Sequence, residues 1–448
     1  MKVYKDNFIT VLITLAIIVA MGFAGFLIGS FLLAPKPKSA STKSTYKAKV
    51  DYPNGPITLT YWRTVDGTKV FDEILNKWQQ EHANVKIEIK DIPFAEYDAK
   101  LAQAAKNNAL PDLFMLKSDW VPRYKNYLKP SPNAVFEVED YKKTFAPVVA
   151  SDLIYNNEIY AVSYGVPTLG LFYNSDKYSS AGVSEAPPTW QSLLDINSKL
   201  VTKQGSGLIN SGIALGTPNI SAASSIMPLL MIQNGAVMTD TPPTKATFEK
   251  PGADNYPSGP KALDFYTSFA RPNKSSYSWS DGFGNDIKAF EQGKTAMIID
   301  FPYRYSQIKS EAPSLNFKTA SAPQVNSSSP LNYTVYWAEA VNKNTKYPEV
   351  AWDFYNFMTS YEIMNMYSVP TLKPASRLDL AKAQEQDDVL GPFAKQVPTA
   401  KSYYKGNSAL TDSAMIQMIN TALTGFDSAI AVRVASENVT KSIQQYPY

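Results

Sequence analysis

Two segments of the sequence place aromatic and carboxylate side chains directly after predicted strands. Trp62 and Asp66 come at and just beyond the end of the alternating segment 57–62, and Asp119 and Trp120 follow the apolar segment 112–116. Ligands of open α/β sheets gather at the carboxyl ends of the strands. An aromatic ring offers a flat apolar face and a carboxylate accepts hydrogen bonds, so these positions predict a binding site.

Other kinds of site chemistry are excluded or disfavoured by composition. The chain has no cysteine, which rules out disulfides, thiolate metal sites, cysteine nucleophiles and a lipid-modified cysteine anchor. His82 is the only histidine, so a multi-histidine metal site is excluded, and its place at the polar end of a predicted helix indicates a solvated side chain. We therefore expect no metal site and no catalytic residue.

The net charge of +3 comes from the N-terminal end. Residues 1–56 hold seven lysines and two aspartates, which leaves 36 basic and 38 acidic residues in the rest of the chain. A body with no excess of positive charge is a poor match for phosphate backbones, so we expect no nucleic-acid partner. The 28 tyrosines and 7 tryptophans instead supply many flat faces with polar edges.

The N-terminal segment predicts a membrane anchor followed by a linker. Phe8–Leu33 contains 26 residues without a charge, which as a helix would extend about 39 Å and could cross a hydrocarbon core of about 30 Å. A cleaved signal peptide is the alternative, although its apolar region is usually only about 7–15 residues long. Lysines are more numerous after this segment than before it. By the positive-inside tendency this would place the folded body in the cytoplasm, against the extracytoplasmic location that the rest of the sequence favours. The Lys-, Ser-, Thr- and Pro-rich segment that follows reads as a flexible tether.

The first part of the folded body alternates predicted strands and helices. Strands are expected at 57–62, 85–89 and 112–116, with helices around residues 70–78 and 97–105 between them. This β-α-β-α-β order is typical of a parallel sheet with crossover helices. Trp78, Trp190 and Trp352 lie on helical patterns and are expected in the core.

The segment 160–174 is a β run that is interrupted once. Gly165 tolerates unusual dihedral angles, and Pro167 fixes φ and withholds an amide donor from a ladder. We interpret the segment as a strand that passes from one sheet to another and forms a first hinge; a bulged strand inside one domain is the alternative.

Further elements follow this crossover. Thr189 is expected as the N-cap of a helix, and a short helix at 286–293 precedes a buried strand at 294–299. That strand delivers Tyr303 and Tyr305, which we expect to alternate on its end. Strands at 317–323 and 333–341 and a helix at 348–358 complete the readable part.

The order of these signatures resembles the extracellular solute-binding proteins of ABC importers, the large group that includes maltose-binding protein. The resemblance covers about residues 57–378 and rests on the segments 60–62, 111–112, 172–174, 188–190, 289–297, 322–323 and 351–354. It implies an α/β fold with two lobes that are joined by hinge crossovers, here preceded by one transmembrane helix. It also implies a binding protein without a cofactor.

The resemblance divides the chain into six segments. Residues 1–34 would be the transmembrane anchor and 35–56 the linker, 57–166 and 324–357 would form the N-lobe, and 167–323 and 358–448 would form the C-lobe. Such a protein is expected to be a monomer on the extracytoplasmic side of the cell membrane, with a small solute, ABC permease subunits and the membrane as partners.

The resemblance also implies a carbohydrate ligand, because rings pack against the C–H faces of sugars while carboxylates and amides take the hydroxyls. The ligand-binding residues that it implies are Trp62, Asp66, Asp119, Trp120, Tyr303, Tyr305, Trp337, Tyr403 and Tyr404. At the crossover, Pro167 stands where maltose-binding protein has a ligand-binding carboxylate, which argues against maltose itself. Arg304 and Glu339 are expected to be exposed or to lie between the lobes.

Two other functions stay open at this point. The same fold could bind peptides or other non-sugar solutes. A glycan-cleaving enzyme would need two carboxylates about 5–9.5 Å apart. Asp281 and Asp286 are the crowded pair near a glycine-rich segment, and a solvated turn explains them better.

Overall fold

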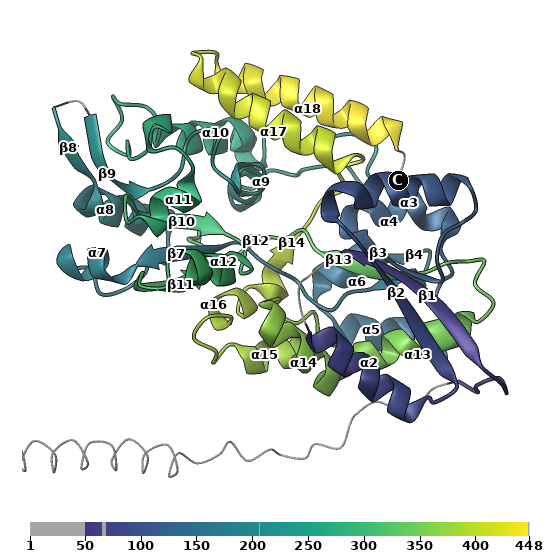
Figure 1. Cartoon of the computed structure of the whole chain (residues 1–448). Helices are drawn as coiled ribbons and strands as arrows, with labels where there is room; N and C mark the ends of the chain where they lie inside the picture. Colours follow the sequence, from purple (N-terminus) through teal and green to yellow (C-terminus); the bar gives the residue numbers. More distant parts are fainter. Residues whose placement is uncertain (1–49, 65–68, 206, 447) are drawn as a thin grey trace, which may run out of the picture. The chain divides into compact units, whose positions relative to one another are not determined.

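The computed structural model describes residues 50–64, 69–205, 207–446 and 448, and these residues belong to one compact unit. Within it, two five-stranded sheets stand apart, each covered by helices (Figure 1). The strand order is β2-β1-β3-β13-β6 in the first sheet and β11-β7-β10-β9-β8 in the second. We call the two halves the first and the second lobe.

The strands of the first sheet are β1 (Ile57–Thr64), β2 (Val85–Ile92), β3 (Leu113–Lys117), β6 (Ala161–Val162) and β13 (Trp337–Val341). The strands of the second sheet are β7 (Gly170–Asn174), β8 (Thr202–Gln204), β9 (Gly207–Ile213), β10 (Thr295–Asp300) and β11 (Phe317–Ser321). Two small pairs are formed by β4 (Ile154–Tyr155) with β5 (Glu158–Ile159) and by β12 (Asn332–Tyr333) with β14 (Ala400–Lys401).

The α-helices are α2 (Val70–Glu81), α3 (Phe94–Lys106), α4 (Val121–Tyr124), α5 (Val138–Thr144), α6 (Pro147–Leu153), α7 (Ser175–Ser180), α8 (Trp190–Leu200), α9 (Ala223–Gln233), α10 (Ser258–Ser268), α11 (Asp286–Glu291), α12 (Arg304–Glu311), α13 (Pro348–Met358), α14 (Tyr361–Thr371), α15 (Leu378–Gln384), α16 (Gly391–Ala394), α17 (Ser408–Leu423) and α18 (Ser428–Gln445). Thr189 caps α8 through a capping box, as its sequence predicts.

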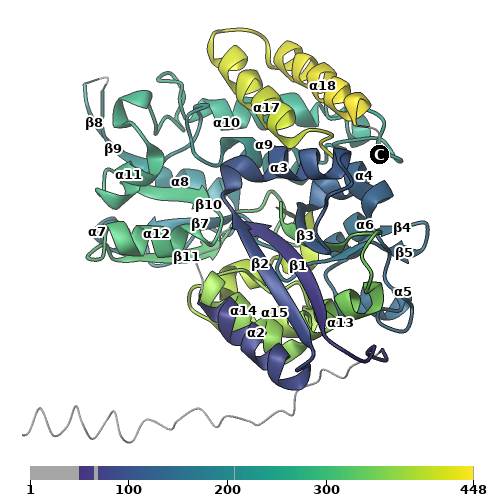
Figure 2. The same cartoon turned by 45° about the vertical axis from the view of Figure 1, so that its right-hand side comes forward.

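Hydrophobic periodicity explains the first lobe. Along β1 buried and exposed residues alternate, and β1 pairs in parallel with both β2 and β3. The helix α2 buries Phe71, Ile74 and Trp78 at helical spacing. The indole of Trp78 meets the ring of Phe354 on α13 edge to face, with centroids 5.2 Å apart. In both views α2 and α13 cover one face of the sheet and α3 the other (Figure 2).

The interrupted β run joins the two sheets. β6 pairs with β13 in the first sheet, while β7 pairs with β10 and β11 in the second. A Cβ atom on Gly165 would lie 2.9 Å from Lys373 Cβ and 3.0 Å from Pro374 O, so glycine permits a close approach of two backbones here. The chain passes between the lobes again after β11 and near β14, where β12 and β14 pair.

Each lobe has its own hydrophobic core. One buried cluster gathers residues of β1–β3, β13 and their helices. The other gathers residues of β7, β9, β10, β11 and α17–α18. The first cluster also includes residues beyond position 358. Ile363, Met364, Tyr367 and Leu380 belong to the first cluster, because α14 packs on α2, where Tyr367 meets Phe71 edge to face.

Two expectations about polar residues are wrong. His82 is only 7% exposed, because its ring stacks between Trp78 and Tyr52 at centroid distances of 3.8 and 4.8 Å. Glu339 is 3% exposed and accepts a 2.6 Å hydrogen bond from Tyr61 Oη beneath the first sheet. Aromatic residues of the first core contact both His82 and Glu339, and the sequence pattern does not reveal these contacts.

The predicted anchor at residues 1–34 lies outside the described residues, as does the predicted linker up to residue 49. In the part of the chain that the structure describes, no helix combines the length and the apolar character that crossing a bilayer requires.

Candidate functional site

The carboxyl ends of three parallel strands meet at one edge of the first sheet. β1, β2 and β3 end there at Thr64, Ile92 and Lys117. β13 runs antiparallel to β3, and its first residue, Trp337, pairs with Lys117. The residues that follow β1, β2 and β3 and the first residue of β13 therefore lie at this one edge.

Aromatic rings line this edge. The Trp337 ring stands edge to face with Phe94, Tyr97 and Trp120, at centroid distances of 6.1, 5.7 and 5.9 Å. Phe94 is 63% exposed, Trp337 is half-buried and Trp120 is buried. The Nζ atom of Lys117 lies 5.1 Å from the Phe94 ring centroid and 5.3 Å from that of Trp120. We call Phe94, Trp120 and Trp337 the first aromatic face.

Trp62 is not joined to this face by any ring contact among the described residues. Its half-buried ring is covered by Lys90, whose Nζ atom lies 4.8 Å from the centroid. Asp66 lies outside the described residues.

The second lobe presents aromatic residues at the corresponding strand end. β9 and β10 are parallel, and β10 ends at Asp300. The rings of Phe301 and Tyr303 stack with centroids 6.1 Å apart, and Tyr303 is 54% exposed. Arg304 Nε donates a 2.7 Å hydrogen bond to Asp300 and so ties the start of α12 to the strand end.

The expectation that Tyr303 and Tyr305 alternate on a strand end is wrong. The strand stops at Asp300, and α12 begins at Arg304, so Tyr305 is a helical residue. Its ring turns into the second core and lies 5.0 Å from that of Phe317. Tyr303 is therefore the more exposed of the pair, and Tyr305 is half-buried.

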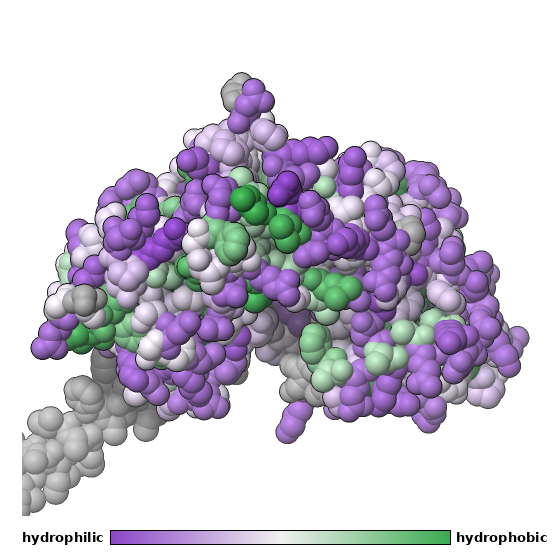
Figure 3. Space-filling view, turned by 90° about the horizontal axis from the view of Figure 1, so that it is seen from above, coloured by the Kyte–Doolittle hydropathy of each residue, from purple (hydrophilic) through white to green (hydrophobic). Residues whose placement is uncertain are grey.

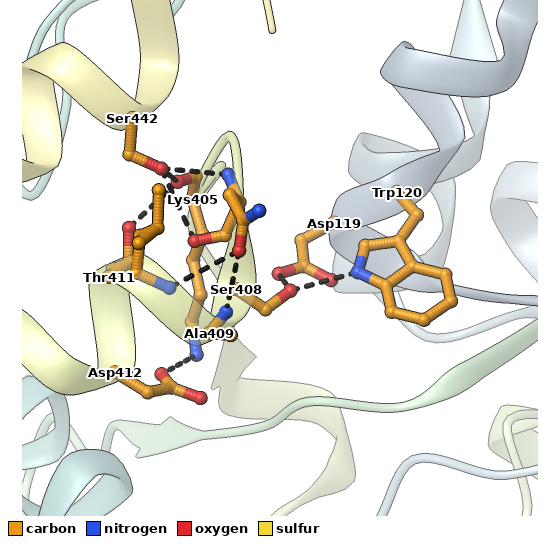
Figure 4. Close-up of polar contacts among 10 residues, drawn as sticks. Asp119, Trp120, Lys405, Ser408, Ala409, Thr411, Asp412 and Ser442 are labelled. Carbon is orange, nitrogen blue, oxygen red and sulfur yellow. Dashed lines mark hydrogen bonds and ion pairs between the residues drawn. The ribbon is translucent and has the colours of Figure 1, made fainter. Parts of the chain in front are cut away.

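Asp119 and Trp120 contact the second lobe through one residue, Ser408, at the start of α17 (Figure 4). Ser408 Oγ donates to Asp119 Oδ2 at 2.6 Å and accepts from Trp120 Nε1 at 2.9 Å. Asp119 is 7% exposed, and its Oδ1 atom has no hydrogen-bond partner among the described residues. Burial raises the pKa of Asp119, although Lys405 and the Ser408 hydroxyl oppose the rise.

Lys405 lies three residues before Ser408, in the segment that leads into α17, and is 2% exposed. Its Nζ atom pairs with Asp412 Oδ1 at 2.7 Å and lies 5.8 and 5.7 Å from the ring centroids of Tyr333 and Tyr403. Burial alone would lower the pKa of Lys405, but Tyr333 and Asp412 raise it well above its ordinary value. The ammonium group is therefore held as a cation within the second lobe.

A cavity of about 640 Å³ lies between the lobes, next to Asp119. It is lined by Ser118, Asp119, Pro122, Ser151, Asp152 and Tyr155 of the first lobe, by Ile232, Gly235, Ala236, Val237, Met238, Thr239, Asp240, Thr241 and Pro243 of the second lobe, and by Leu331, Lys401, Ser402, Tyr403, Tyr404 and Tyr448. A notch between the two lobes is also visible at the surface (Figure 3).

The structure thus separates the predicted site residues into groups. Asp119, Tyr403 and Tyr404 line the cavity, whereas Trp120 and Trp337 belong to the first aromatic face. The Oη atom of Tyr404 donates to Tyr446 O, while that of Tyr403 has no partner among the described residues.

Sequence reasoning missed Phe94, Asp152 and Ser408. Phe94 follows β2 and Pro93, so the rule that located Trp62 and Trp120 could have found it. Asp152 and Ser408 carry no such signal, because each acquires its partners from segments more than 180 residues away along the chain.

Solved structures of sugar-binding proteins share the fold. The sugar-binding protein of Xanthomonas citri superposes with a TM-score of 0.73 at 18% identity, covering 87% of this chain and 98% of that one. The cyclic α-maltosyl-1,6-maltose binding protein of Arthrobacter globiformis gives a TM-score of 0.72 at 20% identity, covering 87% and 100%. The chain therefore has the mixed α/β, two-lobed fold of solute-binding proteins.

Relatives found by sequence are binding proteins, like the solved structures. An ABC transporter extracellular-binding protein of Pyrococcus horikoshii is 21% identical over 414 residues, which cover 89% of this chain and 86% of the relative. The maltotriose-binding protein of Pyrococcus abyssi is 23% identical over 146 residues, a third of either chain. The family model described as "Bacterial extracellular solute-binding protein" matches residues 62–365, more than half of the sequence, and the chain belongs to this family.

Proposed function

We propose that this protein is the receptor of an ABC importer that binds a carbohydrate, most simply an oligosaccharide, between its two lobes and delivers it to a permease. The observation that carries the carbohydrate assignment is the first aromatic face, because it places the exposed ring of Phe94 and the half-buried ring of Trp337 at the edge of the sheet where ligands of such folds gather. The names of similar proteins, which include binders of maltotriose and cyclic maltosyl-maltose, support the same ligand class.

The rings would supply the apolar part of binding. Covering about 50 Å² of apolar area on one ring yields about 1 kcal/mol, so several rings must act together. Phe94 and Trp337 offer such faces on the first lobe and Tyr303 offers one on the second. A sugar that touches both lobes would stabilise the closed arrangement relative to the open one.

Polar side chains would take the hydroxyls. Of the carboxylates predicted from the sequence, Asp119 is described, and it has one oxygen without a partner among the described residues. Trp62, Asp66, Tyr305, Tyr403 and Tyr404 remain proposed ligand residues, although the Lys90 contact of Trp62 and the core packing of Tyr305 weaken the proposal for those two.

We further propose that residues 8–33 anchor the protein in the membrane and that residues 34–56 tether the lobes on the extracytoplasmic side. The uncharged length of this segment supports the anchor, and the extracellular family supports the location. The protein would act as a binding protein without catalysis.

A panel experiment tests this function. Purified full-length protein, kept in a detergent without a sugar headgroup, is heated with malto-, manno- and other oligosaccharides and with short peptides. The proposal is supported if one sugar series raises the melting temperature and the sugar is recovered without cleavage. Release of shorter sugars would show an enzyme, and stabilisation by peptides alone would show a different solute.

A further inference from the structure

Ser408 joins the two lobes at a residue of the first aromatic face. Its side chain is 6% exposed and its hydroxyl makes two hydrogen bonds, both to residues more than 280 positions away. We propose that Ser408 is a positioning residue that fixes the Trp120 indole according to the position of the second lobe and thereby couples sugar binding to lobe closure. The coupling to sugar rests on the function proposed above.

The direction of the two bonds fits one hydroxyl group. A carboxylate can only accept and an indole N–H can only donate, so Ser408 Oγ gives its proton to Asp119 Oδ2 and accepts from Trp120 Nε1. Among the described residues, Asp119 Oδ1 has no partner, so the Ser408 bond is the hydrogen bond that satisfies this carboxylate. Removal of the hydroxyl would leave a buried carboxylate and a buried N–H unpaired together.

Contacts within the second lobe fix the backbone at Ser408. Asn407 caps α17 by accepting from the backbone N–H groups of Ala409 and Leu410. Lys405 O accepts from Thr411 Oγ1 and Ser442 Oγ, which ties the start of α17 to α18 (Figure 4). A movement of the second lobe relative to the first would therefore carry the hydroxyl toward or away from Trp120.

Trp120 transmits this position to the rest of the first aromatic face. Its ring lies edge to face with Trp337 at 5.9 Å, and the Arg123 guanidinium lies 5.4 Å from its centroid. Trp337 in turn touches the exposed ring of Phe94. An indole that loses its hydrogen bond would lose its fixed orientation against these neighbours, so a sugar that stacks on this face would bind less tightly.

The variants that test the proposal are Ser408→Ala, Ser408→Thr and Trp120→Phe in the full-length protein. Ser408→Thr keeps the hydroxyl, and Trp120→Phe removes the indole N–H and keeps a ring. Ser413→Ala, at an exposed position of the same helix, is the matched control. Three properties are measured for each: affinity for maltotriose and for any sugar found with the panel, melting temperature, and ligand-free radius of gyration by small-angle scattering.

We expect Ser408→Ala to weaken sugar binding by about five- to tenfold, on the order of 1–1.4 kcal/mol for a lost hydrogen bond. Ser408→Thr and Ser413→Ala should bind like the natural protein. The double variant Trp120→Phe with Ser408→Ala should lose less affinity than the two single losses added together, because both changes remove the same hydrogen bond. Ligand-free Ser408→Ala should also show a larger radius of gyration than Ser408→Thr.

Unchanged binding and an unchanged radius in Ser408→Ala would overturn the proposal. The proposal would also be overturned if Ser408→Ala lost binding together with a lower melting temperature and Ser408→Thr did not restore binding. Ser408 would then have only a structural role. If the natural protein binds no sugar, the proposed function fails, and the scattering comparison still decides whether Ser408 links the lobes.

Discussion

Ser402 Oγ lies 2.7 Å from both carboxylate oxygens of Asp152, and Tyr336 Oη donates to the same carboxylate at 2.9 Å. Asp152 belongs to α6 of the first lobe, whereas Ser402 and Tyr336 lie on the two later segments that pass between the lobes. One carboxylate therefore holds two crossing segments. Burial outweighs the hydrogen bonds and raises the pKa of Asp152 to about 6.

This raised pKa predicts a dependence of stability on pH. A carboxyl group whose pKa is higher in the folded state than in the unfolded state stabilises the fold below the unfolded pKa, near 4, and loses that contribution as pH rises through about 6. An unfolded pKa near 4 and a folded pKa of about 6 correspond to at most about 3 kcal/mol between pH 4 and pH 7.5. Because Asp152 is partly exposed, solvent screening should make the difference smaller than this.

Denaturant unfolding of Asp152→Asn between pH 4 and pH 8 checks this expectation. The variant should show a flatter profile than the natural protein, since the amide does not titrate. Asp388→Asn, at an exposed position, serves as the control and should leave the profile unchanged. A profile for Asp152→Asn that follows the natural one would contradict the assignment.

Phe94 offers a test of the proposed carbohydrate face. Its ring is 63% exposed, so Phe94→Ala should leave the melting temperature unchanged within about 1 °C while weakening sugar binding by about fivefold, the equivalent of about 1 kcal/mol for one ring face. Phe426→Ala is the matched control, because Phe426 is 59% exposed between α17 and α18, away from the strand ends. Titration calorimetry with the sugar from the panel measures both, and equal affinities for the two variants would contradict the assignment.

The ion pair at the end of β10 predicts a loss of stability on truncation. Asp300 is 1% exposed and pairs with Arg304 at 2.7 Å, so Arg304→Ala leaves a buried carboxylate without its counter-charge. The expected cost is about 3 kcal/mol at neutral pH. Because burial already raises the pKa of Asp300, the cost should be smaller at pH 5 than at pH 8.

The double variant Asp300→Asn with Arg304→Ala provides the control for this pair. It removes the charge that Arg304 compensates, so part of the stability should return at pH 8. Urea unfolding at the two pH values distinguishes the outcomes, and equal costs at pH 5 and pH 8 would show that charge is not the cause.

Gly406 and Gly425 form a natural comparison between two left-handed glycines. Both have positive φ, +65° and +99°, but a Cβ atom on Gly406 would lie 2.2 Å from Ser442 O, whereas one on Gly425 would meet nothing within 4 Å. Gly425→Ala should therefore cost about 1 kcal/mol from backbone strain alone, and Gly406→Ala at least about 2 kcal/mol more, because the backbone of α18 must move. Melting temperatures of the two variants measure the difference, and equal values would contradict it.

Local patterns were sufficient for much of the fold. The alternation of Ile57, Leu59 and Tyr61 predicted β1, and Phe71, Ile74 and Trp78 predicted α2, because burial on one face imposes a period that survives in the sequence. The break at Gly165 and Pro167 predicted the passage from β6 to β7. The boundaries of the lobes in between remain a prediction.

Residues that depend on distant partners could not be placed in this way. His82 looked solvated because its neighbours in sequence are polar, yet Tyr52 and Trp78 enclose it. Tyr305 looked like a strand residue because nothing in the sequence marks Arg304 as the start of α12. Ser408 and Asp119 meet only when both lobes are complete, so their contact is a property of tertiary structure.

The position of β13 between β3 and β6 has a consequence for biosynthesis. A ribosome delivers residues 57–162 long before residues 337–341, so the nascent first sheet has an unfilled slot while the whole of β7–β11 is being made. The second sheet draws all its strands from residues 170–321 and can assemble without waiting. The sheet whose synthesis begins first is therefore the sheet that is completed last.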